Sequence, residues 1–187
     1  MIKNAYEKES KLISYYNKNP KYYSPVNKKE YFLDVLDRFK IENLKSKVVL
    51  DLGCGDGRLC EWLPNIFYYG VDYSTARIEL ARDKFIDKPL ARFDVDCVYE
   101  YVKKWDELYT PDLITIFEVL EHLEKPELLI QLVKEKFPKA DIVGTVPINM
   151  PFTTHLSVWE TEKDMAKVLN PSEVQTDKNK VHWICKW

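Results

Sequence analysis

The sequence predicts an α/β fold in which strands alternate with helices and a hairpin closes the chain. Three observations support this prediction. Short apolar runs typical of buried strands alternate with helical patterns, as in folds with parallel strands joined by helices. The first run opens directly into a glycine-rich turn, and the last two flank the turn-forming triplet Asp177, Lys178 and Asn179. At 187 residues the chain is long enough for one domain with a sizeable core.

The first expected strand, Val48 to Leu52, leads into a turn that contains three of the chain's five glycines, at positions 53, 55 and 57. Glycine lacks the Cβ atom that forbids left-handed backbone and close approach to another molecule. A helix that begins at Arg58 would direct its free N–H groups toward the same turn. This strand-turn-helix unit is therefore predicted to bind a ligand. The alternative is a turn whose glycines serve packing alone.

The spacing of these glycines resembles the S-adenosylmethionine loop of class I methyltransferases. A dinucleotide-binding turn would read G-x-G-x-x-G, but position 58 is arginine, so the pattern is G-x-G-x-G with Asp51 two residues before it. S-adenosylmethionine carries an ammonium and a sulfonium but no phosphate, so a carboxylate suits it. The resemblance implies that the methionine end of this cofactor is held by Asp51, Gly53, Gly55 and Gly57.

The same resemblance implies a three-layer, Rossmann-like fold with a mostly parallel seven-stranded sheet and an antiparallel last strand. It covers residues 30–187, and residues 1–29 form a basic and aromatic arm that is not a separate domain. The residue patterns predict strands at 66–71, 91–95, 113–117 and 140–146, and helices at 28–44, 75–85, 99–108, from 126 onward and at 160–169. The closing hairpin pairs 173–176 with 180–187.

Acidic residues follow the second and third expected strands. Asp72 lies 17 residues beyond Gly55, where a carboxylate in a nucleotide-binding β-α-β unit can accept hydrogen bonds from both ribose hydroxyls. The family places its ribose-binding acid in a similar setting, so the resemblance assigns this role to Asp72, with Tyr73 beside it. Asp72 could also cap the following helix. Asp94 or Asp96 would lie near the adenine, and the sequence does not choose between them.

The end of the fourth expected strand reads FEVLEHLEKPELL and carries Glu118, Glu121 and His122. On one helical turn these residues would lie at i, i+3 and i+4 and share a face. Two carboxylates and an imidazole could ligate a divalent metal, either Mg²⁺ or Mn²⁺, or supply a general base. We expect Glu121 and His122 to be catalytic and Glu118 to line the cofactor pocket as well. The alternative for His122 is a histidine that only shapes this pocket.

The E-x-x-E-H segment is similar to that of ubiquinone-type O-methyltransferases and of RNA 3′-terminal 2′-O-methyltransferases, in which it is linked to metal binding. The RNA enzymes add a later histidine followed by an aromatic stretch, and His155 with Trp159 looks similar. The resemblance therefore implies a metal site formed by Glu118, Glu121, His122 and His155.

Composition narrows the functional class. The net charge of −2 does not indicate a nucleic-acid partner, although residues 1–47 hold eleven Lys and Arg against six acids. This segment could stack on bases, or be a solvated helix whose tyrosines cover the core. No apolar run approaches the ~20 residues of a membrane span, and the N-terminus lacks a signal-peptide pattern, so we expect a cytoplasmic protein without a membrane partner. The four cysteines show no metal-binding spacing.

These patterns together indicate a methyltransferase that moves the methyl group of S-adenosylmethionine to an oxygen of a small-molecule or sugar acceptor. An oxygen acceptor is favoured because the N/D-P-P-Y type motif of many amino-methylating enzymes does not follow the fourth strand. Two alternatives stay open: an RNA ribose 2′-O-methyltransferase with a metal-assisted site, and a non-catalytic regulator or subunit that binds S-adenosylmethionine. The sequence does not indicate the acceptor or the oligomeric state.

Overall fold

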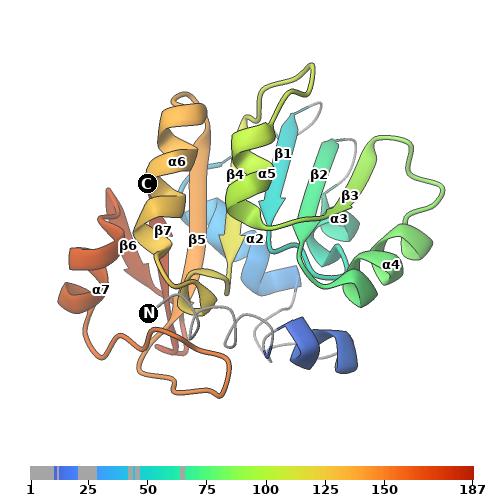
Figure 1. Ribbon diagram of the computed structural model, residues 1–187. Coiled ribbons are helices and arrows are strands. Elements are labelled where there is room, and N and C mark those ends of the chain that lie inside the picture. Colours follow the sequence, from blue (N-terminus) through green and yellow to red (C-terminus); the bar gives the residue numbers. More distant parts are fainter. Residues whose placement is uncertain (1–10, 12, 21–28, 42–43, 45–46, 64–65) are drawn as a thin grey trace.

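A computed structural model describes residues 11, 13–20, 29–41, 44, 47–63 and 66–187, and it shows one sheet between two layers of helices (Figure 1). Its seven strands lie in the order β3-β2-β1-β4-β5-β7-β6, and β7 is antiparallel to both of its neighbours. This confirms the predicted sheet. In chain order the strands are β1 (Val48–Leu52), β2 (Phe67–Asp72), β3 (Ala91–Val95), β4 (Leu113–Phe117), β5 (Asp141–Pro147), β6 (Glu173–Thr176) and β7 (His182–Lys186).

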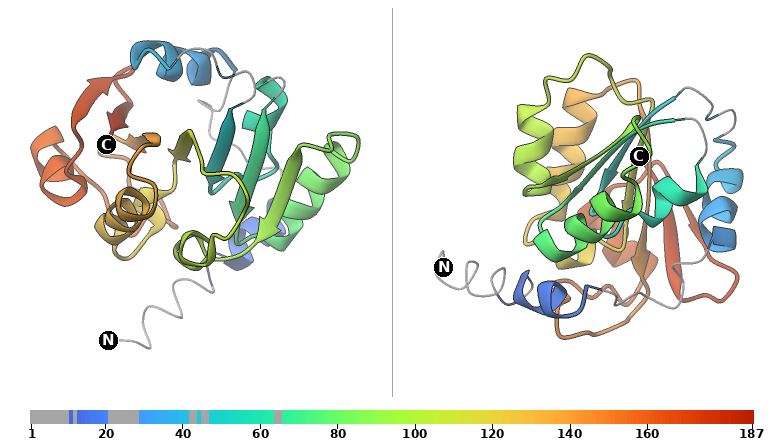
Figure 2. Two further views of the ribbon diagram at one scale, coloured as in Figure 1. Left: turned by 90° about the horizontal axis from the view of Figure 1, so that it is seen from above. Right: turned by 90° about the vertical axis from the view of Figure 1, so that its right-hand side faces the viewer.

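Helices cover both faces of the sheet. The labelled helices are α2 (Lys29–Arg38), α3 (Arg58–Trp62), α4 (Thr75–Lys84), α5 (Val98–Lys104), α6 (Pro126–Lys136) and α7 (Glu162–Leu169), with a short 3₁₀ helix, η1 (Leu120–His122), after β4. Buried side chains of α5, α6 and α7 form one core cluster with the sheet, and those of α2, α3 and α4 form the other. The right-hand view in Figure 2 shows α5 and α6 on the face opposite α2 and α3.

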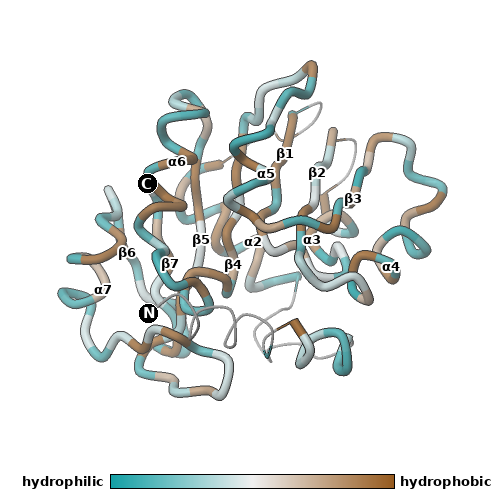
Figure 3. Tube along the Cα trace, viewed as in Figure 1, coloured by the Kyte–Doolittle hydropathy of each residue, from teal (hydrophilic) through white to brown (hydrophobic). Residues whose placement is uncertain are grey.

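The central strands are buried on both faces because their side chains alternate between the two core clusters. In β1, Leu50 and Leu52 pack with α5 and α6, whereas Val49 packs with α2 and α3. All five residues of β1 are buried, and β1 and β4 are hydrophobic over most of their length (Figure 3). Asp51 is the exception in this apolar strand, so a specific role has to explain it.

Three helix boundaries differ from the prediction by two residues or more. Helix α2 ends at Arg38 rather than at residue 44. Helix α5 ends at Lys104, before residue 108, because Trp105 leaves helical backbone and packs its ring against Phe137. Helix α7 begins at Glu162 because Thr161 is the N-cap, with its hydroxyl accepting a hydrogen bond from the backbone N–H of Asp164.

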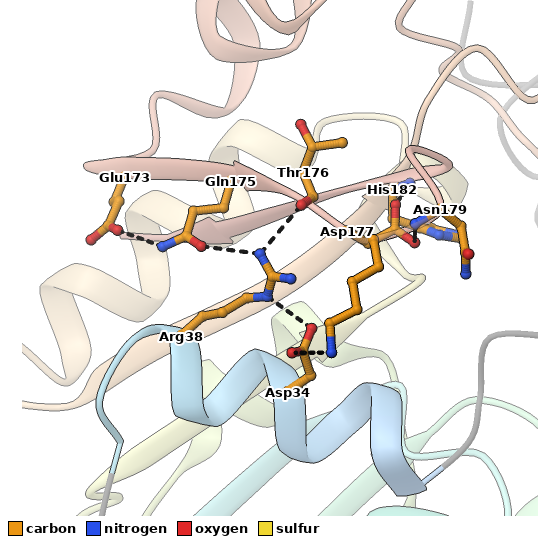
Figure 4. A network of polar contacts seen from close by, with 9 residues as sticks. Asp34, Arg38, Glu173, Gln175, Thr176, Asp177, Asn179 and His182 are labelled. Atoms are coloured by element: carbon orange, nitrogen blue, oxygen red, sulfur yellow. Dashed lines mark hydrogen bonds and ion pairs between the residues drawn. The ribbon is translucent and has the colours of Figure 1, made fainter.

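Helix α2 is fastened to the closing hairpin by a network of polar contacts (Figure 4). The Arg38 guanidinium donates to Asp34 at 2.8 Å, to the side chain of Gln175 and to the carbonyl of Thr176, both at 3.3 Å. In the turn, the Asp177 carboxylate accepts from the backbone N–H of His182 at 2.9 Å. These contacts fix the start of β7, and with it the position of the His182 side chain.

The described part of the N-terminal arm lies at the carboxyl ends of the strands. Residues 13–18 are helical and appear in blue below the sheet in Figure 1, near the loop that joins β5 to α7. Residues 1–10, 12 and 21–28 of the predicted arm lie outside the described residues. Among the helices that the structure describes, none has the length and apolar character to cross a bilayer.

Candidate active site

Two adjoining cavities lie at the carboxyl ends of the parallel strands, where open α/β sheets bind ligands. The larger measures about 730 Å³ and the smaller about 150 Å³. The larger cavity reaches Asp72 and Tyr73 at the end of β2, and the smaller one reaches Asp51, Gly55 and Glu121. The residues that line both are Tyr16, Gly53, Arg77, Glu118, His122 and His155.

The glycine turn bends around the smaller cavity. Gly53 and Gly57 both have left-handed backbone, with φ angles of 80° and 75°. A Cβ atom at Gly57 would lie 2.7 Å from Phe93 and 2.8 Å from Phe85, so this glycine permits packing and does not line either cavity. Gly53 and Gly55 do line the smaller cavity. The structure therefore places two of the three predicted glycines at the smaller cavity and the third in the core behind it.

Asp51 lies beneath the turn with its carboxylate held by two side chains. The hydroxyl of Tyr68 donates to one oxygen, and the hydroxyl of Thr115 donates to the other at 2.7 Å. Burial raises the pKa of Asp51 to about 6, although both hydrogen bonds lower it. Asp51 lines the smaller cavity, so its carboxylate adds negative charge to the wall where the resemblance places the methionine end of the cofactor.

Asp72 joins the end of β2 to the glycine turn. Its Oδ2 atom accepts from the backbone N–H of Gly55 at 3.0 Å, and Oδ1 accepts from that of Ser74 at 2.8 Å. Each carboxylate oxygen can accept more than one hydrogen bond, and Asp72 lines the larger cavity, so it retains acceptor capacity there. Burial raises the pKa of Asp72, and these backbone donors oppose the shift. The N-cap of α4 is Ser74, so Asp72 does not take that alternative role.

The predicted adenine acids lie outside both cavity linings. Asp94 is bound by Arg92, with Nε 2.8 Å from Oδ2, and by the hydroxyl of Tyr101 at 3.0 Å. Asp96 accepts from the backbone N–H of Cys97 at 2.8 Å. The larger cavity is instead lined here by Cys97 and its two successors in the chain. The structure thus does not bring Asp94 to the cavity, because its carboxylate is used to neutralise an arginine at the edge of the sheet.

Glu118 does not share a helical face with Glu121 and His122, and this expectation was wrong. Its backbone is left-handed, with φ of 55°, and the 3₁₀ helix starts only at Leu120. The Glu118 carboxylate therefore turns toward β5 and β7. Oε1 accepts from the Thr145 hydroxyl at 2.9 Å, and Oε2 lies 3.2 Å from Nε2 of His182. Glu118 still lines both cavities, as expected of a residue at the cofactor pocket.

Glu121, His122 and His155 form a compact group, with one potential ligand atom from each lying within 4.8 Å of the others. The Glu121 side chain is fully buried, and neither of its carboxylate oxygens has a hydrogen-bond partner among the residues that the structure describes. A buried carboxyl without a partner is costly. Burial raises the pKa of Glu121 well above its usual range, and the charge of Glu118 makes a smaller contribution in the same direction. The structure thus brings together three of the four predicted metal ligands and directs Glu118 elsewhere.

The two histidines of this group are oriented in the same way. Nδ1 of His122 lies 2.9 Å from the carbonyl of Thr154, and Nδ1 of His155 lies 2.8 Å from that of Met150. A carbonyl only accepts, so each Nδ1 carries the proton and each Nε2 keeps its lone pair. Burial lowers the pKa of His122 to about 4, which keeps its imidazole neutral near pH 7.

His182 and Tyr16 are among the site residues that were not predicted from the sequence. His182 approaches Glu118 from β7, and Tyr16 approaches His122 from the arm, with its hydroxyl 3.4 Å from Nε2. The sequence separation is 64 residues for the first pair and 106 for the second. No local pattern signals such contacts. The one available hint was the alternation of tyrosines with basic residues in the arm, which also fits a solvated helix.

Comparison with known proteins agrees with this geometry. A family model described as "Methyltransferase domain" matches residues 26–171. A ubiquinone biosynthesis O-methyltransferase of Histophilus somni (strain 2336) is 28% identical over 159 residues, which cover 76% of this chain and 67% of that protein. The mitochondrial protein of the same name from Candida albicans is 30% identical over 97 residues, covering 50% of this chain but only 30% of its own length.

Solved structures show the same fold. Magnesium protoporphyrin IX methyltransferase from Synechocystis PCC 6803, crystallised with bound S-adenosylmethionine, superposes with a TM-score of 0.63 at 16% identity, covering 96% of this chain and 95% of that chain. At that identity the likeness shows the fold alone. The family match covers most of the chain, and Gly53 of the glycine turn and the strand-end acid Asp72 both line the larger cavity. The chain therefore belongs to the methyltransferase-domain family, and it has the class I fold of the S-adenosylmethionine-dependent methyltransferases.

Proposed function

We propose that this protein transfers the methyl group of S-adenosylmethionine to an oxygen atom of a small-molecule or sugar acceptor. One observation carries the proposal: the cavity that reaches Asp72 adjoins the group of Glu121, His122 and His155. A site for the methyl donor and a site able to receive a hydroxyl thus share a wall. The O-methyltransferase relatives support oxygen as the acceptor atom, and they favour a small molecule over RNA.

The sulfonium of the donor activates its own methyl group, so the protein's task is to align the acceptor and exclude water. Asp72 would accept the ribose hydroxyls from the larger cavity. Asp51 and the N–H groups of the glycine turn would face the methionine end. The loop after β5 closes the site, since the backbone N–H groups of Leu156 and Ser157 donate to the carbonyl of Glu121 at 2.7 and 3.1 Å.

Glu121, His122 and His155 fit a divalent cation. A carboxylate without a hydrogen-bond partner and two imidazoles whose Nε2 atoms keep a lone pair form a common donor set, and backbone carbonyls at both Nδ1 atoms are the usual outer partners of metal-binding histidines. Two nitrogens and one carboxylate favour Mn²⁺ or Zn²⁺ over Mg²⁺. Such a cation would lower the pKa of a hydroxyl that reaches it. We therefore propose these three residues, without Glu118, as the metal ligands.

The donor site is tested by calorimetry with S-adenosylmethionine and, separately, with NAD⁺. We expect S-adenosylmethionine to bind and NAD⁺ not to bind, and the reverse would refute the assignment. A screen of cell metabolites with a donor labelled on its methyl group would then identify the acceptor, and an acceptor methylated only on nitrogen would contradict the proposed oxygen chemistry. The cytoplasmic location stays a proposal that imaging of the tagged protein would check.

The metal site is tested on chelator-treated protein titrated with Mn²⁺ and with Zn²⁺. We expect one bound ion per chain and a rise in melting temperature that both Glu121→Gln and His155→Ala abolish. Glu127→Gln is the matched control, because Glu127 is an exposed acid on α6. Equal binding by all variants, or no binding to the wild type at millimolar metal, would refute the metal site and leave donor binding to be judged by its own experiment.

A further inference from the structure

The described part of the arm forms a wall of the proposed donor site. Lys11, Tyr15 and Tyr16 line the larger cavity, and Tyr16 also lines the smaller one. These residues come from a helical segment that precedes the methyltransferase sheet in the chain and lies at the carboxyl ends of its strands (Figure 1). This segment therefore forms part of the wall of the larger cavity, and specific contacts must hold it against the sheet.

We propose that residues 13–20 act as a lid over the donor, with Asn17 as its latch and Tyr16 as the positioning residue on its inner side. The proposal rests on the proposed function, because it takes the larger cavity as the site of S-adenosylmethionine. It gives the arm a role in methyl transfer. From the sequence alone, the arm could either bind nucleic acid or be a solvated helix whose tyrosines cover the core.

The latch is a contact between Asn17 and the beginning of α4. The Oδ1 atom of Asn17 accepts from the Ser74 hydroxyl at 2.9 Å and from the backbone N–H of Ala76 at 3.3 Å. The first N–H groups of a helix have no partner within the helix. Asn17 provides an acceptor for the N–H group of Ala76, although the two residues are 59 positions apart in the chain. Ser74 directly follows the Asp72-Tyr73 pair and is itself fully buried. The latch thus ties the arm to the segment that carries the predicted ribose-binding carboxylate.

Tyr16 lies between the donor and acceptor sides of the site. Its ring meets that of Tyr73 edge-on at 6.4 Å between centroids, and the Arg77 guanidinium lies 4.3 Å from its ring centre. On the other side its ring meets that of His122 at 5.9 Å. A single side chain thus contacts the wall of the larger cavity and a proposed metal ligand. Displacing the arm would open the cavity and remove this link between its two sides.

Lid closure is reinforced by a contact with the loop after β5. The rings of Tyr15 and Phe152 meet edge-on at 6.1 Å between centroids, so the arm touches a loop that also carries His155. Arm and loop therefore cover the site from two directions. A bound donor would lie beneath both, and we expect its departure to require release of the Asn17 latch.

The test combines donor affinity with protection of the arm from trypsin, which cleaves after Lys18. In the wild type we expect S-adenosylmethionine to slow this cleavage. Asn17→Ala should weaken donor binding by about tenfold, the effect expected from losing two hydrogen bonds, and should remove the protection. Asn17→Asp keeps the acceptor oxygen and should restore both to within about threefold, because an acid is also favoured at a helix N-terminus. Ser14→Ala, an exposed position on the arm, is the control.

Tyr16 is tested in the same assays. Tyr16→Phe keeps the ring contacts and should bind the donor within about threefold of the wild type, whereas Tyr16→Ala should weaken binding by about tenfold or more. Wild-type affinity and protection in both Asn17→Ala and Tyr16→Ala would overturn the lid, and failure of Asn17→Asp to restore binding would overturn the latch. If the wild type itself does not bind S-adenosylmethionine, the proposed function fails instead.

Discussion

Gly53 is the most constrained position in the glycine turn, and Gly53→Ala measures that constraint. Its φ of +80° lies in the left-handed region, and an added Cβ atom would come within 2.3 Å of Cγ2 of Val119. Carbon atoms pack at about 3.5 to 4 Å, so Val119 or the turn would have to move by more than an ångström. Gly53 thus allows the turn after β1 to lie directly against the segment after β4.

The expected loss of stability has two parts. Left-handed backbone costs alanine about 1 to 2 kcal/mol, and forcing a methyl group into a filled space costs about 1 to 3 kcal/mol. We therefore expect Gly53→Ala to lower the free energy of unfolding by about 2 to 5 kcal/mol. Val119→Ala removes the clashing methyl groups, so the double variant should be more stable than the sum of the single losses predicts, by about 1 to 3 kcal/mol.

Urea unfolding followed by tryptophan fluorescence measures these quantities in the four proteins of the cycle. Gly55→Ala is the matched control: its φ is +56°, but the nearest atom to an added Cβ is Nη1 of Arg77 at 3.4 Å. It should lose only the backbone part, about 1 to 2 kcal/mol, and show no coupling to Val119. Additive losses for Gly53→Ala and Val119→Ala, within about 0.5 kcal/mol, would refute the proposed clash.

Three further predictions follow from the site and its surroundings. Asp51→Asn should reveal the cost of a buried carboxylate. Because the pKa of about 6 in the folded protein exceeds the ordinary 3.8, the free energy of unfolding of the wild type relative to this variant should fall by about 2 kcal/mol between pH 4 and 7, and a flat difference in urea unfolding would contradict this. Asp72→Asn should weaken S-adenosylmethionine binding by about tenfold or more in calorimetry, whereas Asp94→Asn should leave it within about twofold, and equal losses would restore Asp94 to the adenine pocket. Asn170 ends α7 in left-handed backbone, so Asn170→Ala should lower the free energy of unfolding by about 1 kcal/mol in thermal unfolding, whereas Asn170→Gly should not lower it. Equal stability of the alanine variant and the wild type would show that this cap contributes nothing.

The prediction of the fold succeeded where local patterns decide structure. The strand at Leu113–Phe117 has the predicted bounds, because five apolar residues between turn formers have few alternatives to a buried strand. Helix ends were less predictable. Residues 105–108 continue a sequence that could be helical, but Trp105 leaves the helix for a place in the core against Phe137. Packing of one large aromatic ring outweighed the modest helix propensity of the residues that follow it.

The candidate site shows the same division. Sequence reasoning grouped Glu121, His122 and His155, which the structure also places close together, but it added Glu118 because it assumed one continuous helical turn. A left-handed φ at Glu118 breaks that turn, and the hydroxyl of Thr145 and the ring of His182 lie where its carboxylate then points. Tertiary partners such as these decide whether a non-glycine residue adopts left-handed backbone. The local sequence pattern could therefore not predict the conformation of Glu118.

The sequence by itself determined the order of strands and helices, the glycine turn after β1 and the acid at the end of β2. These features depend on short-range sterics and on the periodicity of apolar residues, which neighbouring positions in the chain express. Only the tertiary structure decided which carboxylate faces the two histidines, that Asp94 neutralises an arginine, and that Tyr15 and Tyr16 of the arm line the larger cavity. Those outcomes depend on contacts between residues far apart in the chain, whose energies no local pattern records.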